Sequence, residues 1–267
     1  MRLFSLKLLN DIGWKPAEYN ENLYGKIWNG VAWDGVFFYA ISADGYIIKS
    51  FDSSFKNIIS KNAELGDRNW QDIIYDGALT AISEDGYYAI KVSDNWQSGQ
   101  IENLKNYHWQ KIIYHNGKLV LIDRDGYVSY ADDEHLSEFT NPVKKLNVNN
   151  VRWQTIVHNG TKYIAIADKG YISTSDDCDV WTAPVQKLPY ISPEQNGGWL
   201  CAECVGSTVY ALNWDGVVAT LEQNGQVVQT IYNKNLDRGS WWFTLGKSDK
   251  ELIALSMQNG NISTKRI

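Results

Sequence analysis

Short runs of apolar and β-branched residues, separated by polar turn signals, fill most of the chain. The run WQDIIY at Trp70 is followed by Asp-Gly at Asp76, by the apolar run LTAIS, by a second Asp-Gly at Asp85 and by the run YYAIK. Such runs predict strands, and Asp-Gly or Asn-Gly between them predicts the tight turn of a hairpin. The pattern therefore predicts a meander of short antiparallel strands.

The same phrase recurs six times along the chain. Each copy carries a glycine in its second turn, and these glycines are 40 to 46 residues apart: Gly45, Gly86, Gly126, Gly170, Gly216 and Gly260. A tryptophan stands 16 to 18 residues before each of them: Trp28, Trp70, Trp109, Trp153, Trp199 and Trp242. Repetition at this period is typical of a protein built from equal structural units.

Four short strands fit within each copy, which is the pattern of one β-propeller blade. We predict an all-β fold, a six-bladed β-propeller of four-stranded antiparallel blades that forms a single domain over residues 1–267. The predicted blades are 22–64, 65–104, 105–147, 148–193, 194–236, and 237–267 plus 1–13. The sixth copy is too short for four strands, so the N-terminal stretch Arg2–Asn10 is predicted to supply its outer strand and close the ring.

A polar motif after the third strand of one copy resembles a known repeat family. In GYISTSDDCDVWT, the residues Ser175, Asp177 and Trp181 occupy the places of S-x-D-G-x-x-W, with Cys178 where glycine is usual. This pattern resembles the Asp-box, or BNR-like, repeats of bacterial and bacteriophage β-propellers. The resemblance implies a structural role, in which the short polar side chains satisfy backbone donors of a hairpin turn and the Trp packs beneath it.

Partial matches to the motif occur in two further copies. Ser50 and Asp52 match in the first copy, and Asp133 alone keeps its place in the third. The resemblance implies that these residues are also structural turn residues. Asp-box propellers include sialidases, so a sialidase-like glycoside hydrolase is one alternative, although the chain has no Arg-Ile-Pro motif near its start.

The chain is rich in aromatic residues that carry a polar group, with 12 Trp and 16 Tyr against 7 Phe. The six repeated tryptophans are predicted to pack one blade on the next. Five others break the repeat and are the candidate ligand-binding residues: Trp14, Trp33, Trp96, Trp214 and Trp241. Those in the first two and last two copies would meet at the seam of the ring, which favours one asymmetric site.

Composition narrows the classes of partner. A formal net charge of −6 and the lack of a basic run argue against nucleic acid. No apolar run is long enough to span a bilayer, so no membrane insertion is predicted. The N-terminus lacks the features of a signal peptide, which favours a cytoplasmic or virion-associated location.

Known catalytic signatures are missing from the sequence, which has no G-x-S-x-G, P-loop, H-E-x-x-H or dinucleotide motif. The three cysteines are predicted to be buried thiols, since Cys201 and Cys204 would point to opposite faces of a strand. His115 and His158 occupy equivalent turns of neighbouring blades and are interpreted as surface residues. No metal site, catalytic residue or cofactor is predicted.

The sequence favours a non-enzymatic binding module, of the kind found on phage or bacterial surfaces. The first hypothesis is recognition of carbohydrate or another surface receptor, because sugar rings stack on Trp and Tyr while polar side chains bind the hydroxyls. The alternative is a protein–protein docking or virion assembly module, since the same aromatic residues are enriched at protein interfaces. Oligomer formation or membership of a larger assembly stays open.

Overall fold

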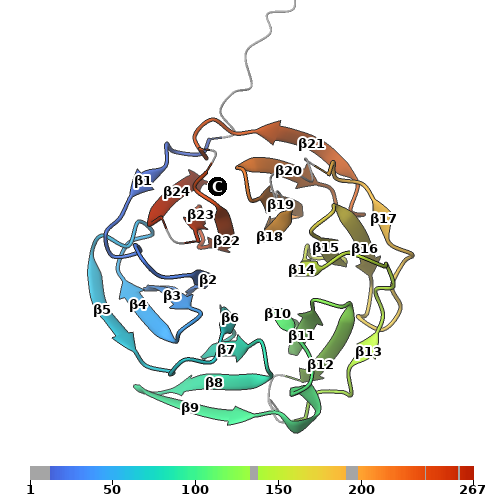
Figure 1. The fold of residues 1–267 in the computed structure, drawn as a ribbon, viewed down its shortest axis with the longest axis horizontal. Coiled ribbons are helices and arrows are strands. Elements are labelled where there is room, and N and C mark those ends of the chain that lie inside the picture. Colours follow the sequence, from blue (N-terminus) through green and yellow to red (C-terminus); the bar gives the residue numbers. More distant parts are fainter. Residues whose placement is uncertain (1–12, 133–137, 191–197, 238, 258) are drawn as a thin grey trace, which may run out of the picture.

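The computed structural model describes residues 13–132, 138–190, 198–237, 239–257 and 259–267. In these ranges the strands form six four-stranded antiparallel sheets arranged in a ring (Figure 1). The one helical element there is a short 3-10 turn, η1 (Glu102–Leu104). The predicted six-bladed β-propeller is confirmed, and each sheet is one blade.

Each blade follows chain order from the channel outward. Blade 1 holds β2 (Trp28–Trp33), β3 (Phe38–Ser42), β4 (Tyr46–Ser50) and β5 (Ile58–Ala63). Blade 2 holds β6 (Trp70–Tyr75), β7 (Leu79–Ser83), β8 (Tyr87–Val92) and β9 (Asn95–Gln100). Blade 3 holds β10 (Trp109–His115), β11 (Lys118–Asp123), β12 (Tyr127–Asp132) and β13 (Val143–Lys144).

The second half of the ring repeats this order. Blade 4 holds β14 (Trp153–His158), β15 (Tyr163–Ala167), β16 (Tyr171–Ser175) and β17 (Val185–Gln186). Blade 5 holds β18 (Trp199–Val205), β19 (Thr208–Asn213), β20 (Val217–Leu221) and β21 (Val227–Tyr232). Blade 6 holds β22 (Trp242–Lys247), β23 (Glu251–Ser256), β24 (Asn261–Arg266) and, as its outer strand, β1 (Glu18–Tyr19).

The ring is closed by a segment from the N-terminal part of the chain, as predicted, but the pairing residues differ from the prediction. The stretch Arg2–Asn10 lies outside the described residues, and the outer strand of blade 6 is β1, in which Glu18 pairs with Ile262. Trp14 makes a further antiparallel bridge to Lys265. The closing strand therefore begins after residue 13, the end of the predicted range. It has no strand pattern in the sequence, because a proline and charged residues stand in this stretch.

Each repeated tryptophan seals the contact between its own blade and the preceding one. The six rings are at most 1% exposed, and each lies in a separate apolar cluster drawn from two neighbouring blades. The indole N–H donates to a backbone carbonyl in the loop that enters its own blade; Trp109 donates to Leu104 O at 2.9 Å. This hydrogen bond explains why the position carries Trp rather than Phe.

The repeated glycines allow two backbone segments to approach closely. Gly216 has a φ of +81°, and a Cβ built there would lie 2.1 Å from the carbonyl oxygen of Leu236. Gly126 is in the same position relative to Leu146, with a φ of +91°. Any other residue would be both strained and in collision at these turns, which gives the glycine spacing its structural cause.

The turn with the full motif match has the geometry of a side-chain-capped hairpin. Asp177 Oδ1 accepts hydrogen bonds from the backbone N–H groups of Asp179 and Val180 at 2.8 and 2.9 Å, and from Ser175 Oγ at 3.1 Å. Cys178 has a φ of +73°, the conformation that glycine usually supplies. Trp181 packs against the turn and donates from Nε1 to Cys178 O at 2.8 Å.

Of the two partial matches to the motif, the structure describes the one in the first copy. Asp52 accepts from the N–H groups of Ser54 and Asn57 at 2.9 and 2.8 Å, and Ser50 Oγ donates to Asp52 O at 3.0 Å. Asp133 lies outside the described residues. The side chains of Asp52 and Ser50 thus hold the turn between β4 and β5.

Candidate functional site

The six inner strands surround a central channel with two different mouths. They are β2, β6, β10, β14, β18 and β22, and each begins with its repeated tryptophan (Figure 1). All six therefore start at one mouth and end at the other. The mouth at the start, called the wide mouth, encloses about 1060 Å³, and the mouth at the end, called the narrow mouth, encloses about 280 Å³.

In blades 2 to 6, the residue that follows the repeated tryptophan lines the wide mouth. In blades 2 to 4 this residue is a glutamine, whereas blades 5 and 6 supply apolar side chains: Gln71, Gln110, Gln154, Leu200 and Phe243. Blade equivalence places these side chains at a similar depth. One side of the wide mouth can therefore form amide hydrogen bonds, and the other can accept an apolar group.

Charged side chains of both signs also line the wide mouth, and they come from the turns and loops of blades 2 to 4. The Nη1 atom of Arg124 lies 3.9 Å from Glu84 Oε1, and these side chains are 33% and 26% exposed. Asp168 accepts from the backbone N–H groups of Arg152 and Lys169 at 3.0 and 2.7 Å. Arg124 and Arg152 both border the cavity. The wide mouth can therefore bind groups of either charge.

Two of the candidate tryptophans meet beside the wide mouth. Trp214 lines the cavity, and its ring centroid lies 5.2 Å from that of Trp241 with the planes tilted by 34°. Trp241 is 43% exposed and has a φ of +54°, an uncommon conformation for a large residue. Blades 5 and 6 thus present a partly exposed aromatic pair beside the wall that Leu200 and Phe243 line.

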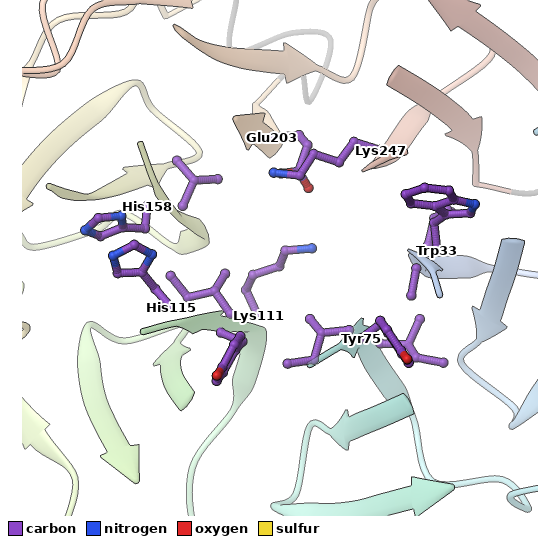
Figure 2. Close-up of a pocket in the computed structure, with 14 residues that line it drawn as sticks. Trp33, Tyr75, Lys111, His115, His158, Glu203 and Lys247 are labelled. Atoms are coloured by element: carbon purple, nitrogen blue, oxygen red, sulfur yellow. The ribbon is translucent and has the colours of Figure 1, made fainter. Parts of the chain in front are cut away.

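The narrow mouth has aromatic walls and a charged interior. Figure 2 shows Trp33 and Tyr75 on one side of the cavity and His115 and His158 on the other. The tip of Lys111 points between them towards the part of the channel where the side chains from blades 5 and 6 lie. Blades 1 to 4 therefore supply rings at this mouth, and the charged side chains come from blades 3, 5 and 6.

Two ion pairs cross between blades at the narrow mouth. Asp72 is fully buried and its Oδ1 lies 2.9 Å from Lys111 Nζ, while Glu203 Oε1 lies 3.0 Å from Lys247 Nζ. Burial alone would lower the pKa of Lys111, but the Asp72 and Glu203 carboxylates outweigh it and the pKa is raised. Burial raises the pKa of Asp72, and Lys111 opposes that change. The four groups balance to zero formal charge.

His115 and His158 stack face to face, with ring centroids 3.4 Å apart and planes 18° apart. His158 Nδ1 accepts from the N–H of Gly160 at 3.1 Å, so the proton of the neutral ring is on Nε2. Burial and the neighbouring His115 lower the pKa of His158 to about 4, and burial also lowers that of His115. The equivalence of the two turns was visible in the sequence, but the stacked pair was not.

The stacked pair predicts a loss of stability in mild acid. Because the unfolded chain takes up a proton near pH 6.5 that folded His158 takes up only near pH 4, the free energy of unfolding should fall as pH drops through this interval. His115→Gln removes the charge repulsion between the rings and should make this fall smaller. Urea titrations of wild type and His115→Gln between pH 6.5 and pH 4 measure how far the free energy of unfolding falls in each. The carboxylates are the same in both proteins, so their contribution cancels. An equal fall in the two proteins would contradict the prediction.

The structure separates the five candidate tryptophans instead of bringing them together. Trp14 is 1% exposed and packs with Trp242 between blades 5 and 6, so the prediction of a ligand contact there is wrong: it is a core residue that anchors the closing segment. Trp96 lies on the outer strand β9 and donates to Glu64. Trp33 lines the narrow mouth, whereas Trp214 lines the wide mouth.

Ligand contact by the remaining four candidates stays a prediction, with Trp214 and Trp241 the only two whose rings pack on each other. Sequence reasoning missed the glutamine layer and the two ion pairs. The phrase W-Q in blades 2 to 4 was the available signal for the glutamines. The paired residues are about 40 positions apart, so the sequence of a single copy carries no signal for them.

The described part of the chain shows no group of three His, Cys, Asp or Glu side chains that could hold a metal ion. The three cysteines are buried and free, as predicted. Burial raises the pKa of the Cys178 and Cys204 thiols to about 11. Nor does any helix within the described ranges have the length and apolar character needed to cross a bilayer.

No protein-family model and no curated protein sequence matches this chain. Solved structures do resemble it. The WD40 β-propeller domain of Doa1 is 12% identical with a TM-score of 0.63, over 94% of this chain and 96% of that one. The β-propeller domain of Cps50 (Swd1) from Myceliophteria thermophila is 11% identical with a TM-score of 0.58, over 90% and 82% of the two chains.

YCF48, in a structure bound to D1 peptide, is 14% identical with a TM-score of 0.57, over 89% of this chain and 76% of that one. At these identities the likeness concerns the fold alone. The comparisons and the sheet topology together show that this chain is a β-propeller, with WD40-type propellers among its structural neighbours.

Proposed function

We propose that this propeller is a non-catalytic binding module that receives a peptide segment of a partner protein in its wide mouth. The observation that carries the proposal is the division of this mouth into a glutamine-lined half and an apolar half. An extended peptide needs both, because its backbone amides require hydrogen-bond partners while its side chains need apolar pockets.

The charges and the neighbouring structures support the same proposal. Arg124, Arg152 and Glu84 border the mouth and would select among charged side chains of the partner. A propeller of similar fold, YCF48, has been solved with a peptide bound, and the WD40-type fold commonly mediates protein interaction. We place the anchor for an apolar side chain at Leu200 and Phe243, next to Trp214.

Carbohydrate binding at the same mouth is the second candidate. The partly exposed pair of Trp214 and Trp241 beside amide and carboxylate side chains is the arrangement that would stack a sugar ring and bind its hydroxyls. A relationship to Asp-box propellers likewise stays a proposal, supported by the capped turn at Asp177.

The test is selection of binders from a random peptide library on the immobilised protein, followed by fluorescence anisotropy on the selected sequences. We expect Phe243→Ala and Trp214→Ala to weaken binding by about tenfold or more, as for aromatic anchors in an interface. Phe51→Ala is the matched control, because this ring is 63% exposed on an outer turn of blade 1.

A glycan array with the same variants separates the two candidates. Peptide binding that depends on Phe243 supports the proposal. Glycan binding that depends on Trp241, with no peptide selected, would replace it by the second candidate. Binding that Phe51→Ala weakens as much as Phe243→Ala would place the site outside the wide mouth.

A further inference from the structure

The narrow mouth holds a polar site that the proposed peptide function does not use. Its cavity of about 280 Å³ is just below the usual range for ligand pockets and suits one molecule of the size of an amino acid. The cavity lies at the opposite end of the channel from the glutamine layer. It can therefore be examined independently of the wide mouth.

The cation at its base is held in place from below. Lys111 is 12% exposed and Asp72 is fully buried, so the ion pair at 2.9 Å is part of the protein interior. Asp72 Oδ2 also accepts from the backbone N–H of Ile112 at 3.2 Å, which fixes the carboxylate. An ammonium group has three donors, and Figure 2 shows the tip of Lys111 directed into the cavity.

The facing groups come from blades 5 and 6. Glu203 is 19% exposed, and its Oε1 accepts both from Lys247 Nζ at 3.0 Å and from the N–H of Cys204 at 2.9 Å. Both contacts use the same carboxylate oxygen, and the Glu203 side chain lines the cavity. Glu203 also interacts electrostatically with Lys111, so the cavity presents both a cationic and an anionic pole.

The walls between these poles are rings. Trp33 and Tyr75 line one side, and Tyr114 and the stacked pair His115 and His158 line the other. Burial and the mutual proximity of the imidazoles keep the pair neutral at neutral pH, because the pKa of His158 is lowered to about 4. These walls add area for an apolar group but no net charge.

We propose that the narrow mouth binds a small zwitterion with an apolar body, of the class of free α-amino acids. Lys111 and Lys247 would hold the carboxylate, Glu203 the ammonium group, and the rings of Trp33 and Tyr75 the side chain. The two cations and two anions of the site already balance, so a singly charged ligand would bring a net charge into a partly desolvated cavity. A neutral molecule with both charges matches both poles.

The experiment is calorimetric titration of the full chain with L-phenylalanine and with two analogues that each lack one charge, phenethylamine and 3-phenylpropionate. We expect L-phenylalanine to bind and each analogue to bind about tenfold more weakly or worse, since each loses its contacts with one charged pole of the cavity. L-Tryptophan and L-leucine test the size of the apolar body.

The variant Glu203→Gln keeps the side-chain shape and removes the anionic pole. It should bind L-phenylalanine and 3-phenylpropionate with similar affinity. The control is Glu251→Gln, since Glu251 begins β23 and pairs with Lys15 away from the cavity, and this variant should behave as wild type. Circular dichroism confirms that both variants are folded. Equal affinity for the amino acid and its analogues would overturn the proposal, as would discrimination against 3-phenylpropionate that survives in Glu203→Gln, or no heat with any amino acid. Peptide binding at the wide mouth would be unaffected by each of these outcomes.

Discussion

Lys111→Met should lower the free energy of unfolding by about 3 to 5 kcal/mol, as for other buried pairs that lose one partner. The reason is that Asp72 is fully buried and would keep a carboxylate with no cation beside it. Burial already raises the pKa of Asp72, so the variant should be relatively more stable in acid, where this carboxyl group is protonated. Urea unfolding followed by tryptophan fluorescence measures both effects.

The double variant Asp72→Asn, Lys111→Met identifies the cause. Because it removes the charge together with its partner, it should recover most of the lost stability. Lys56→Met is the control for lysine loss, since Lys56 and its partner Glu18 are both more than half exposed, and its unfolding should be close to that of wild type. A double variant as unstable as Lys111→Met would mean that lost packing, and not the unpaired carboxylate, causes the effect.

Trp109→Ala should destabilise the protein by about 3 to 5 kcal/mol, the range for deleting a large aromatic residue from a core. The ring is fully buried between blades 2 and 3 and packs against Leu104, Leu121 and Ile82. Its removal leaves a cavity at the contact between two blades and frees the carbonyl of Leu104 from its indole donor. Thermal and urea unfolding measure the loss.

Trp109→Phe divides this loss into two parts. The variant keeps most of the ring but cannot donate to Leu104 O, so its stability should lie between those of wild type and Trp109→Ala. Phe51→Ala, which removes an exposed ring, should change the free energy of unfolding by about 0.5 kcal/mol or less. Unfolding midpoints that are the same for Trp109→Ala and Phe51→Ala would contradict the sealing role of the repeated tryptophans.

The blade pattern was readable because it depends on local chemistry. A Trp at the start of the inner strand and a glycine in the second turn recur in all six copies, and each has one structural cause that acts within a blade and its neighbour. Turn residues such as Asp177 were readable for the same reason, because a capped turn is made by residues that are close in sequence. Periodicity therefore predicted the fold and the number of blades.

The closing segment was less readable because its partner is distant in the chain. Glu18 and Tyr19 have no alternating apolar pattern, and they become a strand by pairing with Ile262 and Asn261. Trp14 looked like an irregular surface residue for the same reason. Its burial depends on a cluster formed with blade 6, which no neighbouring sequence shows.

The sequence by itself determined the repeat, the strands, the turns and the six-bladed ring, since these follow from side-chain pattern and backbone preference over a few residues. Only the tertiary structure decided which side chains share a mouth of the channel. It placed Trp33 and Trp214 at opposite ends, stacked His115 on His158, and paired Lys111 with Asp72. Closing the ring brings residues of different blades together, and such contacts have no signature in the sequence of one blade.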